Sequence, residues 1–275
     1  MKKNFFSIFF LIISLSLCGA QSAKVKLDSA QAKKKFGTEF SVTPMDKTVT
    51  ISRNKIIISP AQEGLTYTIS GYFNGQVINR TKNTVIKLDN AYLENKNGEP
   101  ALFGEAKTEV SAAKDSENWI VSSGKSDSKT ATIQCKKNLV IGGSGILYVA
   151  GNVFHGVKAD DVKVKGSGTL YFQGSKKGAA LNCTSLTVEN DKTFKAYFVN
   201  SKNGIKADST ITINSGNFYF YNNETALKTD TKKDNPKQEH SITLAGGIFH
   251  TYGNANLFQT EKNACKTDGA KFIED

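Results

Sequence analysis

The chain has 275 residues, enough for one large domain or two, and its 39% hydrophobic and 22% charged residues exclude an intrinsically disordered protein. Its 23 Gly, 17 Phe and 9 Tyr against 4 Pro, 2 Met and 1 Trp favour strands and turns, which excludes an all-helical fold. The formal net charge of +11 at pH 7 would attract anionic surfaces in general.

The first twenty residues have the pattern of an export signal. Met1–Lys3 is basic, residues 5–17 are apolar but too few to span a bilayer comfortably, and Cys18–Ala20 resembles a small-residue cleavage site. Removal of this signal peptide, residues 1–20, predicts a secreted or periplasmic protein without a membrane span. The alternative is a lipoprotein anchored through Cys18 at the cell surface, although Leu17 is bulky for such a site.

An internal repeat of about 24 residues follows. One apolar column has leading residues spaced 24, 24, 24 and 22 apart: Ile133, Val157, Leu181, Ile205 and Leu227. A second column begins at Leu139, Val162, Leu186, Ile211 and Ile242. A third, after a glycine-containing turn, contains Leu147, Leu170, Phe194, Phe218 and Phe249. Each segment alternates apolar and polar residues, so three strands in each repeat predict a parallel β-helix.

The repeat predicts an all-β, single-stranded parallel β-helix over residues 60–275, a solenoid with about 24 residues per coil. Residues 21–59 are expected to form a flexible lead-in and a cap, because an open end would expose unpaired strand edges. The polar residues 231–239 are expected to form a surface loop inserted into one coil. Cys135 and Cys183 fall in one inward column two coils apart, roughly 10 Å on the usual strand spacing, and are therefore predicted to be reduced core residues.

A succession of short motifs lies at residues 64–71, 74–77, 85–91 and 101–103, with later units at 203–208 (NGIKAD) and 215–218 (SGNF). This succession resembles a family of secreted bacterial β-helix proteins, the carbohydrate-binding domain-containing proteins. The resemblance implies a right-handed parallel β-helix, the hand that parallel crossovers generally take. It also implies binding of an acidic polysaccharide such as polygalacturonate, calcium held at turns, and no demonstrated hydrolytic role.

The chain departs from the family pattern at the turns. Where that family tends to have Asp before Gly-Ile, this chain has His155, Lys177 and Asn203. Calcium takes six to eight oxygen ligands, so these replacements weaken the expected site. With calcium as the candidate cofactor, the remaining candidate ligands are Asp160, Asp161, Asp208 and Asp230. The alternative is that these acids pair with neighbouring lysines.

Two outward patterns predict the binding surface. Tyr rings in rows can lie against the C–H faces of sugars while their hydroxyls bond sugar oxygens, and lysines can meet the carboxylates of a polyuronate. The predicted carbohydrate-binding residues are Tyr171, Tyr197, Tyr219, Tyr221, Tyr252, Lys158, Lys206 and Lys228. The alternatives are that stacked tyrosines only stabilise the sheet and that lysine and aspartate ladders neutralise each other.

The sequence therefore predicts noncatalytic binding of an acidic polysaccharide outside the cytoplasm, without nucleic acid as a partner. Two alternatives stay open. A polysaccharide lyase needs a base and cations; the only arginines, Arg53 and Arg80, lie far from the acids, which leaves a lysine near Asp208 and Asp230 as base. A surface adhesin or structural scaffold would use the β-helix only as a rigid support.

Overall fold

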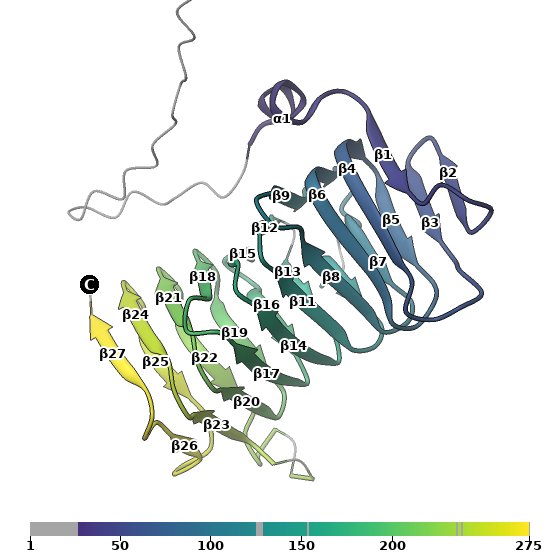
Figure 1. Ribbon diagram of the computed structural model, residues 1–275. Coiled ribbons are helices and arrows are strands. Elements are labelled where there is room, and N and C mark those ends of the chain that lie inside the picture. Colours follow the sequence, from purple (N-terminus) through teal and green to yellow (C-terminus); the bar gives the residue numbers. More distant parts are fainter. Residues whose placement is uncertain (1–26, 125–128, 153, 235, 238, 275) are drawn as a thin grey trace, which may run out of the picture.

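The computed structural model describes residues 27–124, 129–152, 154–234, 236–237 and 239–274. The predicted signal peptide and the alternative lipid anchor at Cys18 lie outside these residues. The described chain forms a column of stacked coils, with helix α1 (Ser29–Phe36) and the strands β1 (Phe40–Thr43) and β2 (Val49–Ser52) near its N-terminal end (Figure 1).

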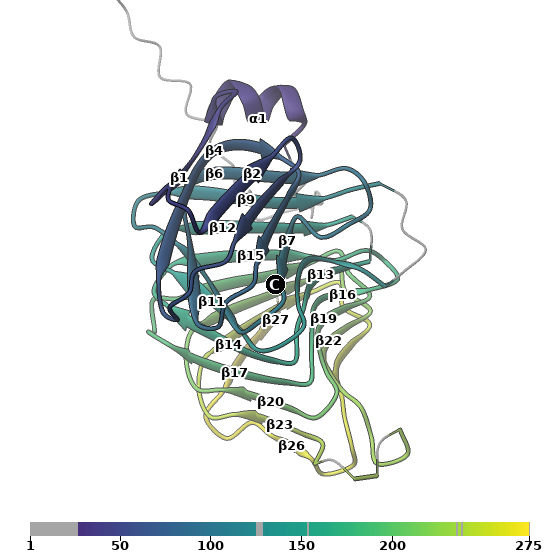
Figure 2. The same cartoon turned by 90° about the vertical axis from the view of Figure 1, so that its right-hand side faces the viewer.

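The coils stack three faces of strands, which Figure 2 shows from the end that carries β1 and β2. The first face is a ten-stranded sheet of β2, β3 (Lys55–Ile58), β5 (Gln76–Asn79), β7 (Leu102–Gly104), β10 (Ala131–Cys135), β13 (His155–Lys158), β16 (Ala179–Cys183), β19 (Asn203–Ala207), β22 (Thr225–Thr229) and β25 (Asn256–Gln259). The second face contains β8 (Thr108–Ala112), β11 (Leu139–Gly143), β14 (Asp161–Gly166), β17 (Ser185–Asn190), β20 (Thr210–Ile213), β23 (Ser241–Leu244) and β26 (Cys265–Lys266). The third face contains β9 (Glu117–Ser122), β12 (Ile146–Gly151), β15 (Thr169–Gln173), β18 (Lys195–Val199), β21 (Asn217–Tyr221), β24 (Ile248–Tyr252) and β27 (Lys271–Glu274).

The long strands β4 (Thr66–Asn74) and β6 (Thr84–Asn95) run through both the second and the third face. They join these faces into one 17-stranded sheet, in which β6 pairs with β8 and with β9. Strand β1 pairs with β4 and β2 pairs with β3 in antiparallel fashion, whereas the other pairings are parallel. The described fold is therefore the predicted all-β parallel β-helix.

The first face confirms the predicted inward column. Val157 is in register with Leu181, Leu181 with Ile205, and Ile205 with Leu227, and each of these side chains is fully buried. Burying apolar side chains in this way drives folding, but no coil can do it alone, because each coil covers its neighbour. The thiols of Cys135 and Cys183 are free and buried, as predicted.

The third column differs from the prediction in one coil. Ala196, not Phe194, is in register with Leu170 and with Phe218. The turn before β18 is longer, so the strand begins two residues later than equal spacing suggests. Phe194 remains fully buried in that turn, with its ring centroid 6.0 Å from that of Phe218. This shift places Tyr197, rather than Lys195, beside Tyr171.

Glycines form the corner between the second and third faces. Gly143 and Gly166 are stacked neighbours with φ of 110° and 113°, a conformation that L side chains rarely adopt. A Cβ atom at Gly166 would lie 2.2 Å from the carbonyl oxygen of Gly143. The corner between the third and first faces instead uses Asn200 and Asn222 at φ of 54° and 55°.

The N-terminal segment is more ordered than the predicted lead-in. Helix α1 begins with a capping box in which the Asp28 side chain accepts from the Gln31 amide and Gln31 bonds the Asp28 amide. Parallel pairing begins with β3 at Lys55, before the predicted start of the β-helix at residue 60. The antiparallel strands β1 and β2 lie at the N-terminal edges of the two sheets, where the cap was expected.

Candidate functional site

An aromatic ladder runs along the outer surface of the third face. Its members occupy the same outward position on successive strands: Tyr72, Tyr92, Trp119, Tyr148, Tyr171, Tyr197, Tyr219 and His250. Side chains alternate across a strand, so the flanking residues, such as Leu170 and Phe172 around Tyr171, point into the core. The ladder includes three of the predicted binding tyrosines. Its N-terminal members were not predicted.

The rings of the ladder stack face to face. From Trp119 to His250, successive centroids are 3.9, 4.5, 4.4, 4.3 and 4.5 Å apart, at interplanar angles between 9° and 13°. Each inner ring therefore has both faces covered by neighbouring rings. The sequence predicted that sugars lie against exposed ring faces, but this stacking leaves mainly ring edges and phenol hydroxyls for a partner.

The hydroxyls of the ladder form a row of hydrogen-bonding groups. Burial raises the pKa of both Tyr148 and Tyr171 to about 12, and it also raises the pKa of Tyr197. These phenols therefore keep their protons at neutral pH, and each can both donate and accept a hydrogen bond. Such a row is suited to a partner that itself carries a line of hydroxyl groups.

Helix α1 covers the N-terminal end of the ladder. Tyr72, Tyr92 and Trp119 are buried in a cluster with the fully buried Ala32 of the helix. The Phe36 ring lies 5.7 Å from the ring of Tyr92. The partly exposed part of the ladder consists of Tyr148, Tyr171, Tyr197, Tyr219 and His250.

Polar contacts hold α1 in this position. The Ser29 hydroxyl and the Tyr72 hydroxyl donate to the buried Glu94 carboxylate at 3.0 and 2.8 Å. The Lys35 ammonium lies 2.6 Å from the Glu117 carboxylate. These contacts attach the helix to both β6 and β9.

Two more of the predicted tyrosines lie beside the ladder. Tyr221 and Tyr252 are in register with each other, two residues after Tyr219 and His250. The Tyr221 ring is tilted 59° from that of Tyr219, and Tyr252 is 42% exposed. This pair broadens the aromatic surface at the C-terminal end of the third face.

The predicted lysine row lies on the first face, not beside the ladder. Lys158 and Lys206 flank Asn182, and Lys228 is paired with Lys206. The corner at Asn200 separates β18 of the ladder from β19 of this row. The predicted tyrosines and lysines therefore form two separate surfaces.

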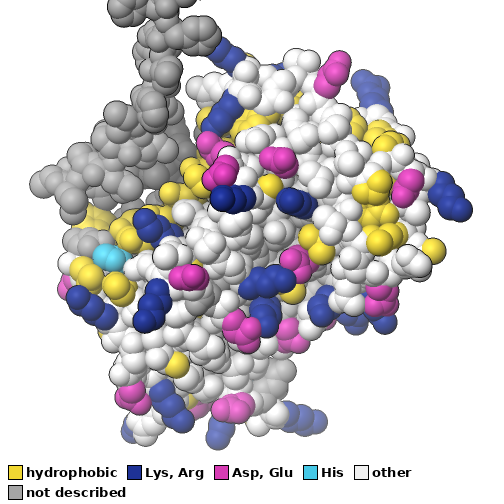
Figure 3. All heavy atoms as spheres, in the orientation of Figure 1, with side chains coloured by type: hydrophobic (Ala, Val, Ile, Leu, Met, Phe, Trp, Pro, Cys, Tyr) yellow, Lys and Arg dark blue, Asp and Glu magenta, His cyan; other side chains and the backbone are white. Residues whose placement is uncertain are grey.

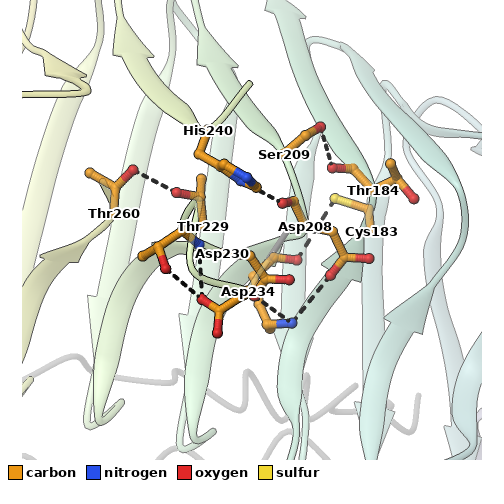
Figure 4. Close-up of polar contacts among 11 residues, drawn as sticks. Cys183, Thr184, Asp208, Ser209, Thr229, Asp230, Asp234, His240 and Thr260 are labelled. Carbon is orange, nitrogen blue, oxygen red and sulfur yellow. Dashed lines mark hydrogen bonds and ion pairs between the residues drawn. The ribbon is translucent and has the colours of Figure 1, made fainter. Parts of the chain in front are cut away.

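The Lys206 ammonium lies between two carboxylates. It is 3.2 Å from both Asp208 Oδ1 and Asp230 Oδ1, two side chains that are labelled in Figure 4. The side chains of all three residues are partly exposed. Burial lowers the pKa of Lys206, but the attraction of both carboxylates outweighs it and raises the pKa above its ordinary value of 10.5. For these two acids, the alternative of pairing with lysine is the one observed.

The other two candidate calcium ligands lie apart from this cluster. The Asp161 carboxylate accepts from the Ser185 hydroxyl at 2.6 Å, and Asp160 is exposed. Within the described ranges, no three His, Cys, Asp or Glu side chains form a group that could hold a metal ion. The Lys206 ammonium lies between Asp208 and Asp230, so calcium would have to displace it to bind both carboxylates.

Charges of both signs are mixed on the surface. Figure 3 shows Lys and Arg side chains interspersed with Asp and Glu on the face toward the viewer, rather than a patch of one sign. Ion pairs on the second face include Lys163 with Glu189 and Lys165 with Glu109. No helix in the described part of the chain is both long and apolar enough to cross a membrane.

Comparison with known proteins agrees with this architecture. The structure is similar to that of a polysaccharide lyase-like protein from C. thermocellum, solved as a gadolinium derivative, with a TM-score of 0.52, 18% identity, and coverage of 83% of this chain and 91% of that chain. At this identity the likeness concerns the fold alone. No curated protein matches the chain. The carbohydrate-binding domain-containing protein family matches it twice, over residues 46–164 and 159–274, and the chain therefore belongs to that family.

Proposed function

We propose that the protein binds an acidic polysaccharide without cleaving it, outside the cytoplasm, and that the partly exposed aromatic ladder is the main contact surface. The observation that carries the proposal is the unbroken row of phenols from Tyr148 to Tyr219 in a member of a carbohydrate-binding family. A polysaccharide extended along the β-helix axis would present its hydroxyls to this row. Tyr252, beside the ladder, would add an exposed ring.

The lysine row supports an acidic rather than a neutral ligand. Lys158 and Lys228 are partly exposed and form no ion pair within the described part of the chain, whereas Lys206 is held by two carboxylates. Lys158 and Lys228 are therefore the two members that can meet carboxylates of a polyuronate. Because they lie on a different face from the ladder, they would contact a second chain or a second segment of the same polymer.

The single tryptophan offers a direct test. Trp119 is the only tryptophan of the chain and stacks on Tyr148 at 3.9 Å, so a ligand that contacts Tyr148 should change its fluorescence. We expect titration with polygalacturonate to change this signal, and a neutral galactan to change it less. Raising the salt concentration should weaken the charge-dependent part of the binding.

Variants separate the two surfaces. Lys158→Gln with Lys228→Gln should remove mainly the salt-sensitive part, while Tyr171→Phe should weaken binding of acidic and neutral glycans by about three- to tenfold, the effect of one neutral hydrogen bond. Equal binding of both polymers at all salt concentrations would contradict the acidic specificity. Absence of binding to either polymer would leave the scaffold alternative.

Two further measurements address the remaining predictions. Calcium binding stays a prediction, and repeating the titration with a chelator tests it. The lyase alternative predicts that incubation with polygalacturonate releases unsaturated oligosaccharides, which absorb ultraviolet light. Loss of such products on changing Lys206 or Asp208 would locate that activity at the cluster of Figure 4.

A further inference from the structure

A depression on the second face lies away from both the aromatic ladder and the lysine row. Its volume is about 270 Å³, and it is lined mainly by Asn83, Lys107, Glu109, Val140, Lys163 and Lys165. Sites for drug-sized ligands usually measure about 300–1,000 Å³, so this depression suits a single sugar residue rather than an oligosaccharide.

Strand β11 contributes the apolar part of the depression. Val140 lies in register between Glu109 and Lys163 and forms an apolar floor. Two residues later, Gly142 is in register with Lys165 of the neighbouring strand. A Cβ atom at Gly142 would lie 1.7 Å from the Lys165 carbonyl oxygen, so the backbone here requires glycine.

Three lysines and one carboxylate surround this floor. The Lys165 ammonium is 2.9 Å from the Glu109 carboxylate, and Lys163 pairs with Glu189 outside the depression. Lys107 is exposed and forms no ion pair with any residue that the structure describes. The lining therefore has a net positive charge, with Lys107 available to an anion.

We propose that this depression binds one anionic sugar residue through its carboxylate or sulfate group. Lys107 and Lys163 contact the anionic group, Val140 lies against the C–H face of the ring, and Glu109 accepts hydrogen bonds from sugar hydroxyls. The inference rests on the acidic ligand class of the proposed function but concerns a different face, so the two sites can fail independently.

The test is a titration of the full-length protein with monosaccharides, in which binding is measured by calorimetry and by NMR chemical shifts. The probes are glucuronic acid, glucose 6-sulfate and neutral glucose, which separate a carboxylate from a sulfate as the recognised group. We expect one or both anions to bind and glucose to bind at least tenfold more weakly. Lys107→Gln with Lys163→Gln should weaken anion binding at least tenfold, and Lys202→Gln, an exposed lysine outside the depression, should leave it unchanged.

The single variant Lys107→Gln controls for a folding defect in the double variant, since Lys107 forms no ion pair among the described residues whereas Lys163 pairs with Glu189. It should reduce anion binding without lowering the melting temperature. Equal binding of glucose and the anions, absence of anion binding, or full binding by the double variant would overturn the proposal. Tyr197→Phe should weaken binding of the polymer but not of glucuronic acid, which distinguishes failure of this site from failure of the ladder.

Discussion

Replacing Tyr197 separates the two contributions of the aromatic ladder, because this ring lies inside the stack. Its centroid is 4.4 Å from that of Tyr171 and 4.3 Å from that of Tyr219. Each aromatic pair contributes about 0.5–1.5 kcal/mol beyond the area that it buries. Tyr197→Ala loses two pairs and part of a buried ring, so we expect the free energy of unfolding to fall by about 2–4 kcal/mol.

Tyr197→Phe keeps both stacked pairs and removes only the hydroxyl. The hydroxyl forms hydrogen bonds to water in the unfolded chain as well, so its removal should change the free energy of unfolding by at most about 1 kcal/mol. If the ladder binds glycan through its hydroxyls, however, Tyr197→Phe should lose nearly as much affinity as Tyr197→Ala. The two variants are thus expected to differ in stability and to agree in binding.

Urea unfolding followed by circular dichroism measures the first quantity, and calorimetry with polygalacturonate measures the second. Tyr252→Phe and Tyr252→Ala are the matched controls, because Tyr252 is 42% exposed and does not lie inside the stack. Its ring face as well as its hydroxyl is open to a ligand. Equal destabilisation by Tyr197→Phe and Tyr197→Ala would refute the stacking argument. Unchanged affinity of Tyr197→Phe would refute the hydroxyl argument.

Three other changes test the fold and its charges. Gly166→Ala should destabilise the protein by about 3 kcal/mol or more. Gly64 also has a positive φ but has open space where a Cβ would lie, so Gly64→Ala should cost only about 1–2 kcal/mol. Equal decreases in melting temperature would contradict the clash at the Gly166 corner. Lys206→Met should cost about 1 kcal/mol at pH 7, since two partly exposed ion pairs are lost. Because the pKa of Lys206 is raised in the folded protein, the stability difference between wild type and Lys206→Met should persist just below pH 10.5 and disappear above the folded pKa. Lys228→Met is the control, and a stability difference that does not change with pH would contradict the argument. Burial lowers the pKa of His155 from 6.5 to about 4. The folded state therefore favours the neutral imidazole, and the stability present above pH 6.5 is lost as the pH falls towards 4. The loss in the free energy of unfolding is up to about 3 kcal/mol. Urea midpoints should therefore depend less on pH in His155→Gln, and an identical slope would contradict the argument.

The regular coils could be predicted from sequence because their inward residues repeat at nearly constant spacing. The column through Val157, Leu181 and Ile205 follows directly from that spacing. The spacing fails at Phe194, since an apolar residue in a turn resembles one in a strand. The spacing of apolar residues within one column does not show whether the extra turn residues precede or follow such a residue.

The ladder and its cover were only partly predictable. Trp119 and Tyr92 lie in coils of irregular length, so no fixed spacing links them to Tyr171. Strand β6 also crosses two faces as one strand, with only Asn90 in the left-handed conformation at its bend. Helix α1 did have a local signal, the capping box at Asp28, but the lysine-rich segment after it has little apolar periodicity. Its position over the ladder depends on contacts with residues more than fifty positions away, such as Glu94.

The near-equal spacing of the uncovered ladder affects how a polymer would bind as well as where. From Tyr148 to Tyr219 the stacked phenols repeat every 4.3 to 4.5 Å, so neighbouring positions along the axis offer almost the same contacts. A long chain can then occupy several shifted alignments of similar energy, and the number of alignments adds favourable entropy to its binding. If the ladder binds a polymer as proposed, movement between alignments would break few contacts at once, and the polymer could slide along the axis until it met α1.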